Sequence, residues 1–289
     1  MTSFILGKID FDIPRLAEDV AAVKTMRKGR ETYDEFSSGF WKNVPLWNEN
    51  GDGSDGLFRD FGLPARPTEY ASHVPYLTEV LEERFNLRQL VMVRARDIVD
   101  ASMMPHKDFL ELEEDPSHQF RVMIVLEDNE ATYNSDEEKV FRMRTGEVWF
   151  LDAAGVHCAA NFSTESRVSL CLDFSFNGPF TPADIFSSPN LYEPGSEPMI
   201  VKRQPLPEHF EMDIRRMAVA CNRHNFRDLA FALAKLHFSY EVPNDACYDW
   251  LIEIADRTDD PALVAKAEQA KDFYIADRKI HERFSFTEW

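Results

Sequence analysis

The chain has 289 residues and a formal charge of −19, from 51 acidic and 32 basic side chains. A protein of that charge repels the phosphates of nucleic acids and of anionic membranes, so neither is an expected partner. Apolar residues make up 44% of the chain and charged residues 29%, which is typical of a soluble globular enzyme and does not suggest disorder.

The cysteines and the N-terminal residues favour a cytoplasmic protein. The chain begins MTSFILGKIDFD, which lacks the basic start and the long apolar run of a signal peptide. No run approaches the roughly 18 apolar residues of a membrane span. The sequence does not predict an oligomeric state. The four cysteines form no CxxC pair and are Cys158, Cys171, Cys221 and Cys247.

The first two thirds of the chain predict one helix followed by short strands. Residues 13–29 have apolar positions at helical spacing, and Gly29 is a suitable end for that helix. No long helix separates the strands after residue 40, which favours an antiparallel sandwich or barrel over a βαβ sheet. The clearest predicted strands are 90–99, 120–128, 147–154 and 167–176.

Beyond Phe176 the pattern changes. Seven of the 16 prolines lie in 177–208, which predicts an extended crossing segment without regular structure. Helical patterns follow, the last beginning at Asp260-Pro261. They cover 208–236, 245–257 and 260–283. We therefore expect a helical segment and β core over 1–178, a crossing segment over 179–207 and a helical region over 208–289.

The string PHKDFLEL suggests a metal site. His106 and Asp108 flank Lys107, so on a strand both side chains lie on one face, and His157 follows the strand 147–154. Two histidines and one carboxylate on one face of a metal leave three positions open. This is typical of Fe(II) oxygenases, in which 2-oxoglutarate takes two positions and O₂ the third. We predict that these three residues are catalytic iron ligands.

A second motif fits the cosubstrate. Arg167 lies ten residues after His157 at the start of a strand, and Ser169 lies on the same strand face. A guanidinium can grip the distal carboxylate of 2-oxoglutarate with two hydrogen bonds, and the hydroxyl can donate a third. We therefore predict that both residues bind 2-oxoglutarate.

In the order and spacing of these motifs, the chain resembles the bacterial free L-proline hydroxylases of the cis-4 and 3-hydroxylase type. The likeness runs through 33–41, 105–113, 120–130 and 140–157, and includes Arg167. The resemblance implies a mainly β protein with a double-stranded β-helix (jelly-roll or cupin-like) core, related to the aspartyl/asparaginyl β-hydroxylases, and a helical C-terminal region. It also implies that His106, Asp108 and His157 bind iron. Free L-lysine 4-hydroxylases are similar as well.

A free amino acid needs a cation for its carboxylate. Arg121 lies at the start of an otherwise apolar predicted strand, where a buried charge needs a partner. It either binds the substrate carboxylate or forms an internal salt bridge with Glu111, Glu113 or Asp128. Arg94 and Arg96 share one face of the strand 90–99, which we expect to be solvated, and one of them, Arg96, is a further candidate for the barrel mouth. The Trp41 side chain either contacts an aliphatic substrate in its pocket or belongs to the hydrophobic core.

Proline is the first substrate hypothesis and lysine the second. Lysine needs an additional carboxylate for its ammonium group, and Glu111, Glu113 and Asp115 follow the metal motif. Two other functions remain open. A peptide or protein hydroxylase of the aspartyl/asparaginyl type predicts an open groove, and a non-catalytic metal-binding jelly-roll protein predicts a filled coordination sphere.

Overall fold

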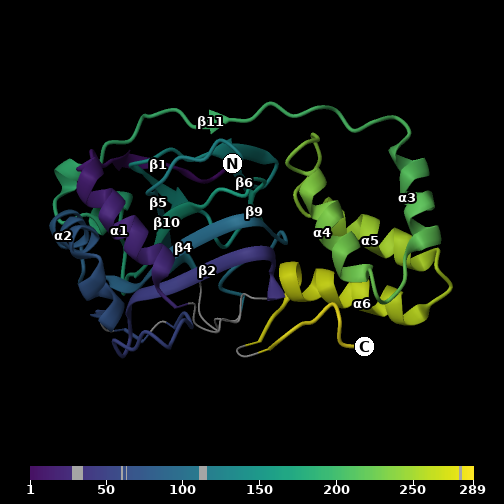
Figure 1. The fold of residues 1–289 in the computed structure, drawn as a ribbon, viewed down its shortest axis with the longest axis horizontal. Helices are drawn as coiled ribbons and strands as arrows, with labels where there is room; N and C mark the ends of the chain where they lie inside the picture. The colour runs from purple at the N-terminus through teal and green to yellow at the C-terminus, as the bar shows by residue number, and fades with distance from the viewer. Residues whose placement is uncertain (28–34, 60, 63, 111–115, 280–281) are drawn as a thin grey trace.

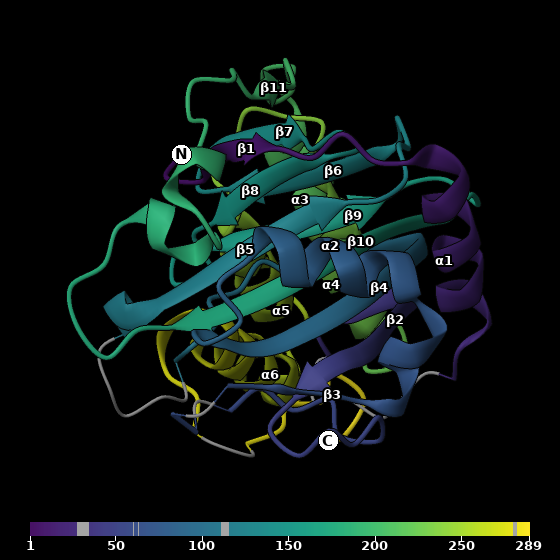
Figure 2. The ribbon, with the colours of Figure 1, turned by 90° about the vertical axis from the view of Figure 1, so that its left-hand side faces the viewer.

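A computed structural model describes residues 1–27, 35–59, 61–62, 64–110, 116–279 and 282–289. Figure 1 shows a curled sheet with α1 and α2 on one side and the C-terminal helices α3 to α6 on the other. Figure 2 views the same sheet from the side of α1 and α2, with the C-terminal helices behind it. Within these described ranges, no helix is long and apolar enough to cross a membrane.

The sheet is built from eleven strands among the described residues, and all pairings between them are antiparallel. Their order is β1-β8-β5-β10-β4-β9-β6-β7-β11, with β2 paired to both β4 and β3. Strands far apart in the sequence are therefore neighbours, and the predicted jelly-roll-like core is confirmed. The strands are β1 (Phe4–Lys8), β2 (Ser37–Asn48), β3 (Arg66–Pro67), β4 (Leu90–Met103), β5 (Gln119–Val125), β6 (Thr132–Asp136), β7 (Lys139–Arg142), β8 (Glu147–Leu151), β9 (His157–Asn161), β10 (Arg167–Ser175) and β11 (Met199–Ile200).

Helices α1 (Ile13–Thr25) and α2 (Pro75–Arg84) cover the outer face of the sheet. Asp12 caps α1 by accepting a hydrogen bond from the Arg15 amide, and Pro14 lies in the first turn, where a missing amide hydrogen does no harm. The helix ends at Thr25. The predicted stop, Gly29, lies outside the described residues. Apolar side chains of both helices share one core with the outward-facing side chains of the sheet.

The two faces of the sheet differ in chemistry. Along β10, Val168, Leu170 and Leu172 belong to the core under α1 and α2. The alternate residues, including Arg167 and Ser169, point to the inner face and are equally buried. A buried polar inner face is costly unless its groups are paired or bind a ligand.

The Pro-rich segment runs from the sheet to the C-terminal helices (Figure 1). Its only regular pieces in the described chain are two short 3₁₀ turns, at Pro182–Ile185 and Pro189–Leu191, and β11, which pairs with β7. The predicted helical stretch 208–236 is two helices, and the stretch 260–283 stops being helical at Ala276. The helices are α3 (Phe210–Ala220), α4 (Phe226–Leu236), α5 (Ala246–Asp256) and α6 (Pro261–Lys271), which continues as a π-helical turn, Asp272–Ala276.

Candidate metal and substrate site

The segment that carries His106 and Asp108 is a loop. β4 ends at Met103, and Phe109 has a φ of 64°, which no strand residue adopts. The expectation that both residues lie on a strand is therefore wrong. His106 instead pairs its backbone with His157 at the start of β9, with N–O distances of 3.0 and 2.9 Å.

This loop nevertheless brings the three side chains together. One possible ligand atom from each of His106, Asp108 and His157 lies within 4.8 Å of the others, and all three residues are buried. The Nε2 atoms lie 3.4 Å (His106) and 3.5 Å (His157) from the Asp108 carboxylate. Each Nδ1–H donates to a carbonyl, of Met104 at 2.9 Å and of Gly155 at 3.1 Å. These bonds select the tautomers that turn an Nε2 lone pair towards the carboxylate.

Burial keeps both imidazoles neutral. It lowers the pKa of His157 to about 4, against the opposing effect of the Gly155 hydrogen bond. Burial also holds the pKa of His106 well below its ordinary value, and the neighbouring His157 lowers it further. Neutral imidazole is the form that binds a metal.

The donor set fits a divalent metal with open positions. Asp108 Oδ2 contacts Arg121, whereas Oδ1 is buried and accepts no hydrogen bond from a described residue. The described residues provide no fourth histidine, cysteine or carboxylate ligand at this cluster. Two imidazoles and one carboxylate suit a metal of the Fe(II) type that retains free coordination positions.

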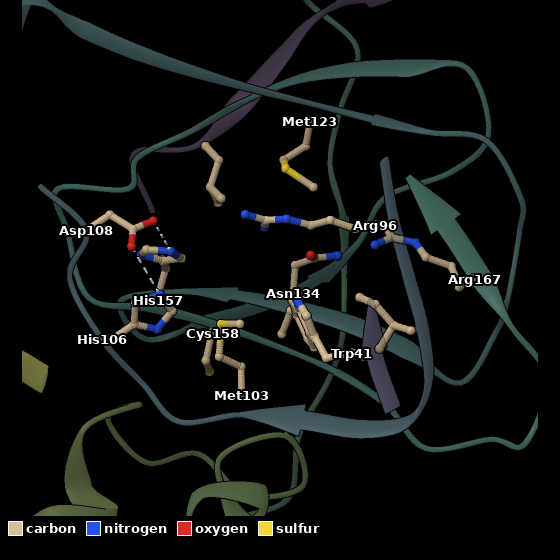
Figure 3. Close-up of a pocket in the computed structure, with 13 residues that line it drawn as sticks. Trp41, Arg96, Met103, His106, Asp108, Met123, Asn134, His157, Cys158 and Arg167 are labelled. Atoms are coloured by element: carbon tan, nitrogen blue, oxygen red, sulfur yellow. Dashed lines mark ion pairs between the residues drawn. The ribbon is translucent and has the colours of Figure 1, made fainter. Parts of the chain in front are cut away.

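A central cavity extends from this cluster into the sheet (Figure 3). In Figure 3 the three candidate ligands lie at one end and Arg167 at the other, with Arg96 and Met123 between them. The residues that line the central cavity are Trp41, Arg96, Ile98, Met103, His106, Asp108, Met123, Asn134, Leu151, His157, Cys158, Ala159 and Arg167.

Strand register places four of the eight predicted site residues, Trp41, Arg96, Arg167 and Ser169, in two rows on the inner face. In each row a residue of β4 is paired with one residue of β2 and one of β10. The first row is Trp41, Ile98 and Arg167, and the second is Asn43, Arg96 and Ser169.

The far end of the cavity carries donors without partners. Arg167 is 1% exposed, and burial lowers its pKa to about 10, so it is a cation at neutral pH. Its Nη2 and the Ser169 hydroxyl are buried and have no hydrogen-bond partner among the described residues. Buried donors of this kind are costly unless a ligand accepts from them, and a carboxylate would do so.

Arg96 also faces the cavity. The prediction of a solvated face is wrong, because Arg94 is fully buried and Arg96 lines the cavity. Burial lowers the pKa of Arg96, and its Nε has no hydrogen-bond partner in the described chain. Trp41 is buried at 3% exposure; it lines the cavity and also packs in the core beside the C-terminal helices.

Arg121 forms internal ion pairs, and neither of the two that the structure describes is with the predicted partner Asp128. Arg121 contacts Asp108, and its Nε donates to Asp173 at 2.6 Å. Asp128 instead accepts from the Thr145 amide, and Glu111 and Glu113 lie outside the described residues.

The sequence interpretation missed Asn134 and Asp173. Asn134 lies on β6, in a stretch where we predicted no strand, and its buried Nδ2 has no partner among the described residues. Asp173 could have been found, because it shares the inward alternation of β10 with Arg167 and Ser169. A carboxylate on that face needs buried cations, and Arg94 and Arg121 supply them.

Comparisons with known proteins identify the family of the chain. The model of the aspartyl/asparaginyl β-hydroxylase family matches residues 8–176, and that of the L-proline 3-hydroxylase C-terminal region matches 182–282. Two Streptomyces proteins, L-proline cis-3-hydroxylases 2 and 1, are 47% and 42% identical over the whole of this chain and of their own. The L-proline cis-4-hydroxylase of Rhizobium meliloti is 32% identical over 99% of this chain and 100% of its own.

Proposed function

The chain belongs to the aspartyl/asparaginyl β-hydroxylase family and, within it, to the L-proline hydroxylases, and from this premise we propose that it converts free L-proline to cis-3-hydroxy-L-proline. The observation that carries the choice of C3 is the match along the entire chain to two cis-3-hydroxylases, which exceeds the match to the cis-4 enzyme. Hydroxylation at C4 is the second candidate, because that enzyme also spans the chain.

His106, Asp108 and His157 are the proposed iron ligands, through both Nε2 atoms and Asp108 Oδ1. Fe(II) bound there with 2-oxoglutarate would activate O₂ for insertion into a C–H bond, with succinate and CO₂ as coproducts. The chain contributes neutral imidazoles of fixed tautomer and a carboxylate with one free oxygen. Arg121 contacts the other carboxylate oxygen, which would leave Oδ1 available to a metal.

Arg167 and Ser169 are the proposed partners of the distal carboxylate of 2-oxoglutarate. Their donors without partners lie at the end of the central cavity away from the metal ligands, as Figure 3 shows for Arg167. The buried guanidinium then gains the counter-charge that the folded chain alone does not supply to its Nη2. Anchored in this way, the cosubstrate is oriented towards the ligand cluster.

Arg96 is the proposed partner of the proline carboxylate. It lies between the metal ligands and Arg167 (Figure 3), and its Nε lacks a described partner. Arg121, the other candidate, already has carboxylate partners in Asp108 and Asp173, which disfavours it. Trp41, Met103 and Met123 give the pyrrolidine ring apolar walls and exclude water from the reacting carbon.

The alternative substrates and functions have less support. All three relatives described above act on L-proline, so lysine gains no support, and the acids considered for its ammonium group lie outside the described residues. A peptide would need an open groove, whereas nearly all residues that line the central cavity are buried. A structural metal site would need a fourth ligand, which the described chain does not provide at this cluster.

A comparison of three substrates, each supplied separately, tests the proposal. The purified protein, supplied with Fe(II), 2-oxoglutarate and O₂, is given free L-proline, free L-lysine or a proline-containing peptide, and succinate is measured. We expect succinate formation that depends on free L-proline. Faster turnover of lysine or of the peptide would overturn the proposal.

A further inference from the structure

The C-terminal helical region contacts the loop of the candidate metal ligands directly. Pro105 to Asp108 belong to no helix or strand, so contacts from elsewhere must fix the directions of His106 and Asp108. Figure 1 shows the C-terminal helices gathered on the side of the sheet opposite α1 and α2.

Each peptide group of this loop is held from two sides. In the unit that joins Pro105 to His106, the Tyr248 hydroxyl donates to the Pro105 carbonyl at 2.6 Å, and the His106 amide donates to His157 at 3.0 Å. A peptide unit is planar, with its C=O and N–H pointing in opposite directions. The helical region and the sheet therefore hold opposite edges of one plane.

The next two units repeat the arrangement. The His106 carbonyl accepts from the His157 amide at 2.9 Å, while the Lys107 amide donates to the Tyr274 carbonyl at 2.9 Å. The Lys107 carbonyl accepts from Arg278 Nη2 at 3.0 Å, while the Asp108 amide donates to Ala153 at 2.8 Å. The helical region thus takes the place that a second neighbouring strand would have.

The third ligand is held in the same way. The Asn244 side chain, just before α5, donates to the Val156 carbonyl at 2.7 Å, and the His157 amide of that peptide unit donates to His106. Tyr274 can accept from Lys107 because carbonyls at the end of a helix have no intrahelical partner. The π-helical turn Asp272–Ala276 places that carbonyl beside the loop.

Aromatic packing supports these bonds. The rings of Tyr248 and Tyr274 are fully buried and stacked, with centroids 5.9 Å apart. The Phe36 ring lies 4.8 Å from that of Tyr274 and 4.9 Å from the His106 imidazole. The imidazole is therefore in contact with the same packed cluster that holds its backbone.

We propose that the C-terminal helical region positions the metal ligands, and that Tyr248 and Asn244 are the positioning residues whose side chains fix the peptide units preceding His106 and His157. This inference rests on the proposed ligand set. If this is so, loss of the Tyr248 hydroxyl reduces the free energy of metal binding more than it reduces the free energy of unfolding of the metal-free protein. The ring that remains in Tyr248→Phe still fills its place in the core.

The test compares Tyr248→Phe and Asn244→Ala with Tyr76→Phe. The hydroxyl of Tyr76, on α2, accepts a 2.7 Å hydrogen bond from the amide of Asp12 at the start of α1, so its removal costs one hydrogen bond outside the ligand loop. Metal-stripped proteins are titrated with Co(II), and the visible absorption gives the dissociation constant. Thermal unfolding without metal gives the stability. The constants for Tyr248→Phe and Asn244→Ala should rise about three- to tenfold, and that for Tyr76→Phe should not change.

Two results would overturn the inference: a dissociation constant within twofold of wild type in both loop-contacting variants, or an equal rise in Tyr76→Phe. His106→Ala separates the inference from the proposed function. If His106→Ala binds Co(II) as wild type does, the ligand assignment itself fails. If it loses the metal while Tyr248→Phe and Asn244→Ala keep it, only the positioning role fails.

Discussion

The Nε atom of Arg121 donates a 2.6 Å hydrogen bond to the Asp173 carboxylate. The other Asp173 oxygen accepts from Arg94 at 2.8 Å, and Arg121 also contacts Asp108, so positive and negative groups alternate through the buried inner face. Burial raises the pKa of Asp173, but Arg121 and Arg94 outweigh burial and hold it below its ordinary value. The candidate metal ligand Asp108 is the last member of this chain of charges.

Asp173→Asn should destabilise the protein strongly. It removes the carboxylate that two buried guanidinium groups share, and breaking a buried ion pair on one side costs about 3–5 kcal/mol. Urea unfolding of the metal-free protein measures the loss. Glu211→Gln is the control, because it breaks an exposed ion pair with Arg215 and should cost no more than about 1 kcal/mol. A cost for Asp173→Asn as small as that of the control would contradict this account of the network.

Arg167→Lys should affect one cosubstrate selectively. Lysine keeps the charge but loses the planar fork that makes two hydrogen bonds to a carboxylate. We expect the apparent KM for 2-oxoglutarate to rise at least about tenfold, while that for L-proline changes little. Steady-state kinetics with each substrate varied in turn give the two KM values. An unchanged KM for 2-oxoglutarate would remove Arg167 from the cosubstrate site.

Arg96→Lys should show the opposite selectivity. If Arg96 binds the amino-acid carboxylate, this variant raises the KM for L-proline by about tenfold and leaves that for 2-oxoglutarate nearly unchanged. The same two titrations serve as the measurement, and Arg167→Lys is the matched comparison. A rise confined to 2-oxoglutarate would place Arg96 at the cosubstrate instead.

His237 should make stability depend on pH. Burial lowers its pKa to about 4, against the Val242 hydrogen bond, and Arg203 lowers it further. The unfolded chain therefore binds a proton at this imidazole more readily than the folded chain does. The contribution of His237 to the free energy of unfolding is fully present above about pH 6.5 and is lost as the pH falls from 6.5 to 4. The lowering of the His237 pKa from 6.5 to about 4 corresponds to about 3 kcal/mol.

His237→Gln should remove that part of the loss. Unfolding free energies of the metal-free proteins at several pH values between 7.5 and 4.5 give the comparison. Parallel pH profiles for the variant and the wild type would show that His237 does not contribute.

The strand pattern and the site motifs could be predicted from the sequence because both are local. The apolar and polar alternation of 90–99 and 167–176 identifies β4 and β10, and the spacing of His106, Asp108 and His157 suggests a metal site. The residues that share an inner face follow from the same alternation once the strands are paired.

Long-range pairing could not be predicted in the same way. That β10 lies between β4 and β5 depends on the assembled sheet, and this pairing gives Arg121 its partner Asp173 and turns Arg96 into the cavity. The loop form of Pro105 to Asp108 depends on hydrogen bonds with Tyr248, Tyr274 and Arg278, more than 140 residues further along the chain. No local pattern near His106 indicates those partners.

Product analysis tests the central claim most directly. The purified protein is incubated with Fe(II), 2-oxoglutarate, O₂ and ¹³C-labelled L-proline, beside the His106→Ala variant, and NMR locates the new hydroxyl group. We predict cis-3-hydroxy-L-proline with one succinate per product in the wild type and no product in the variant. Hydroxylation at C4, or product formation by His106→Ala at the wild-type rate, would contradict the account.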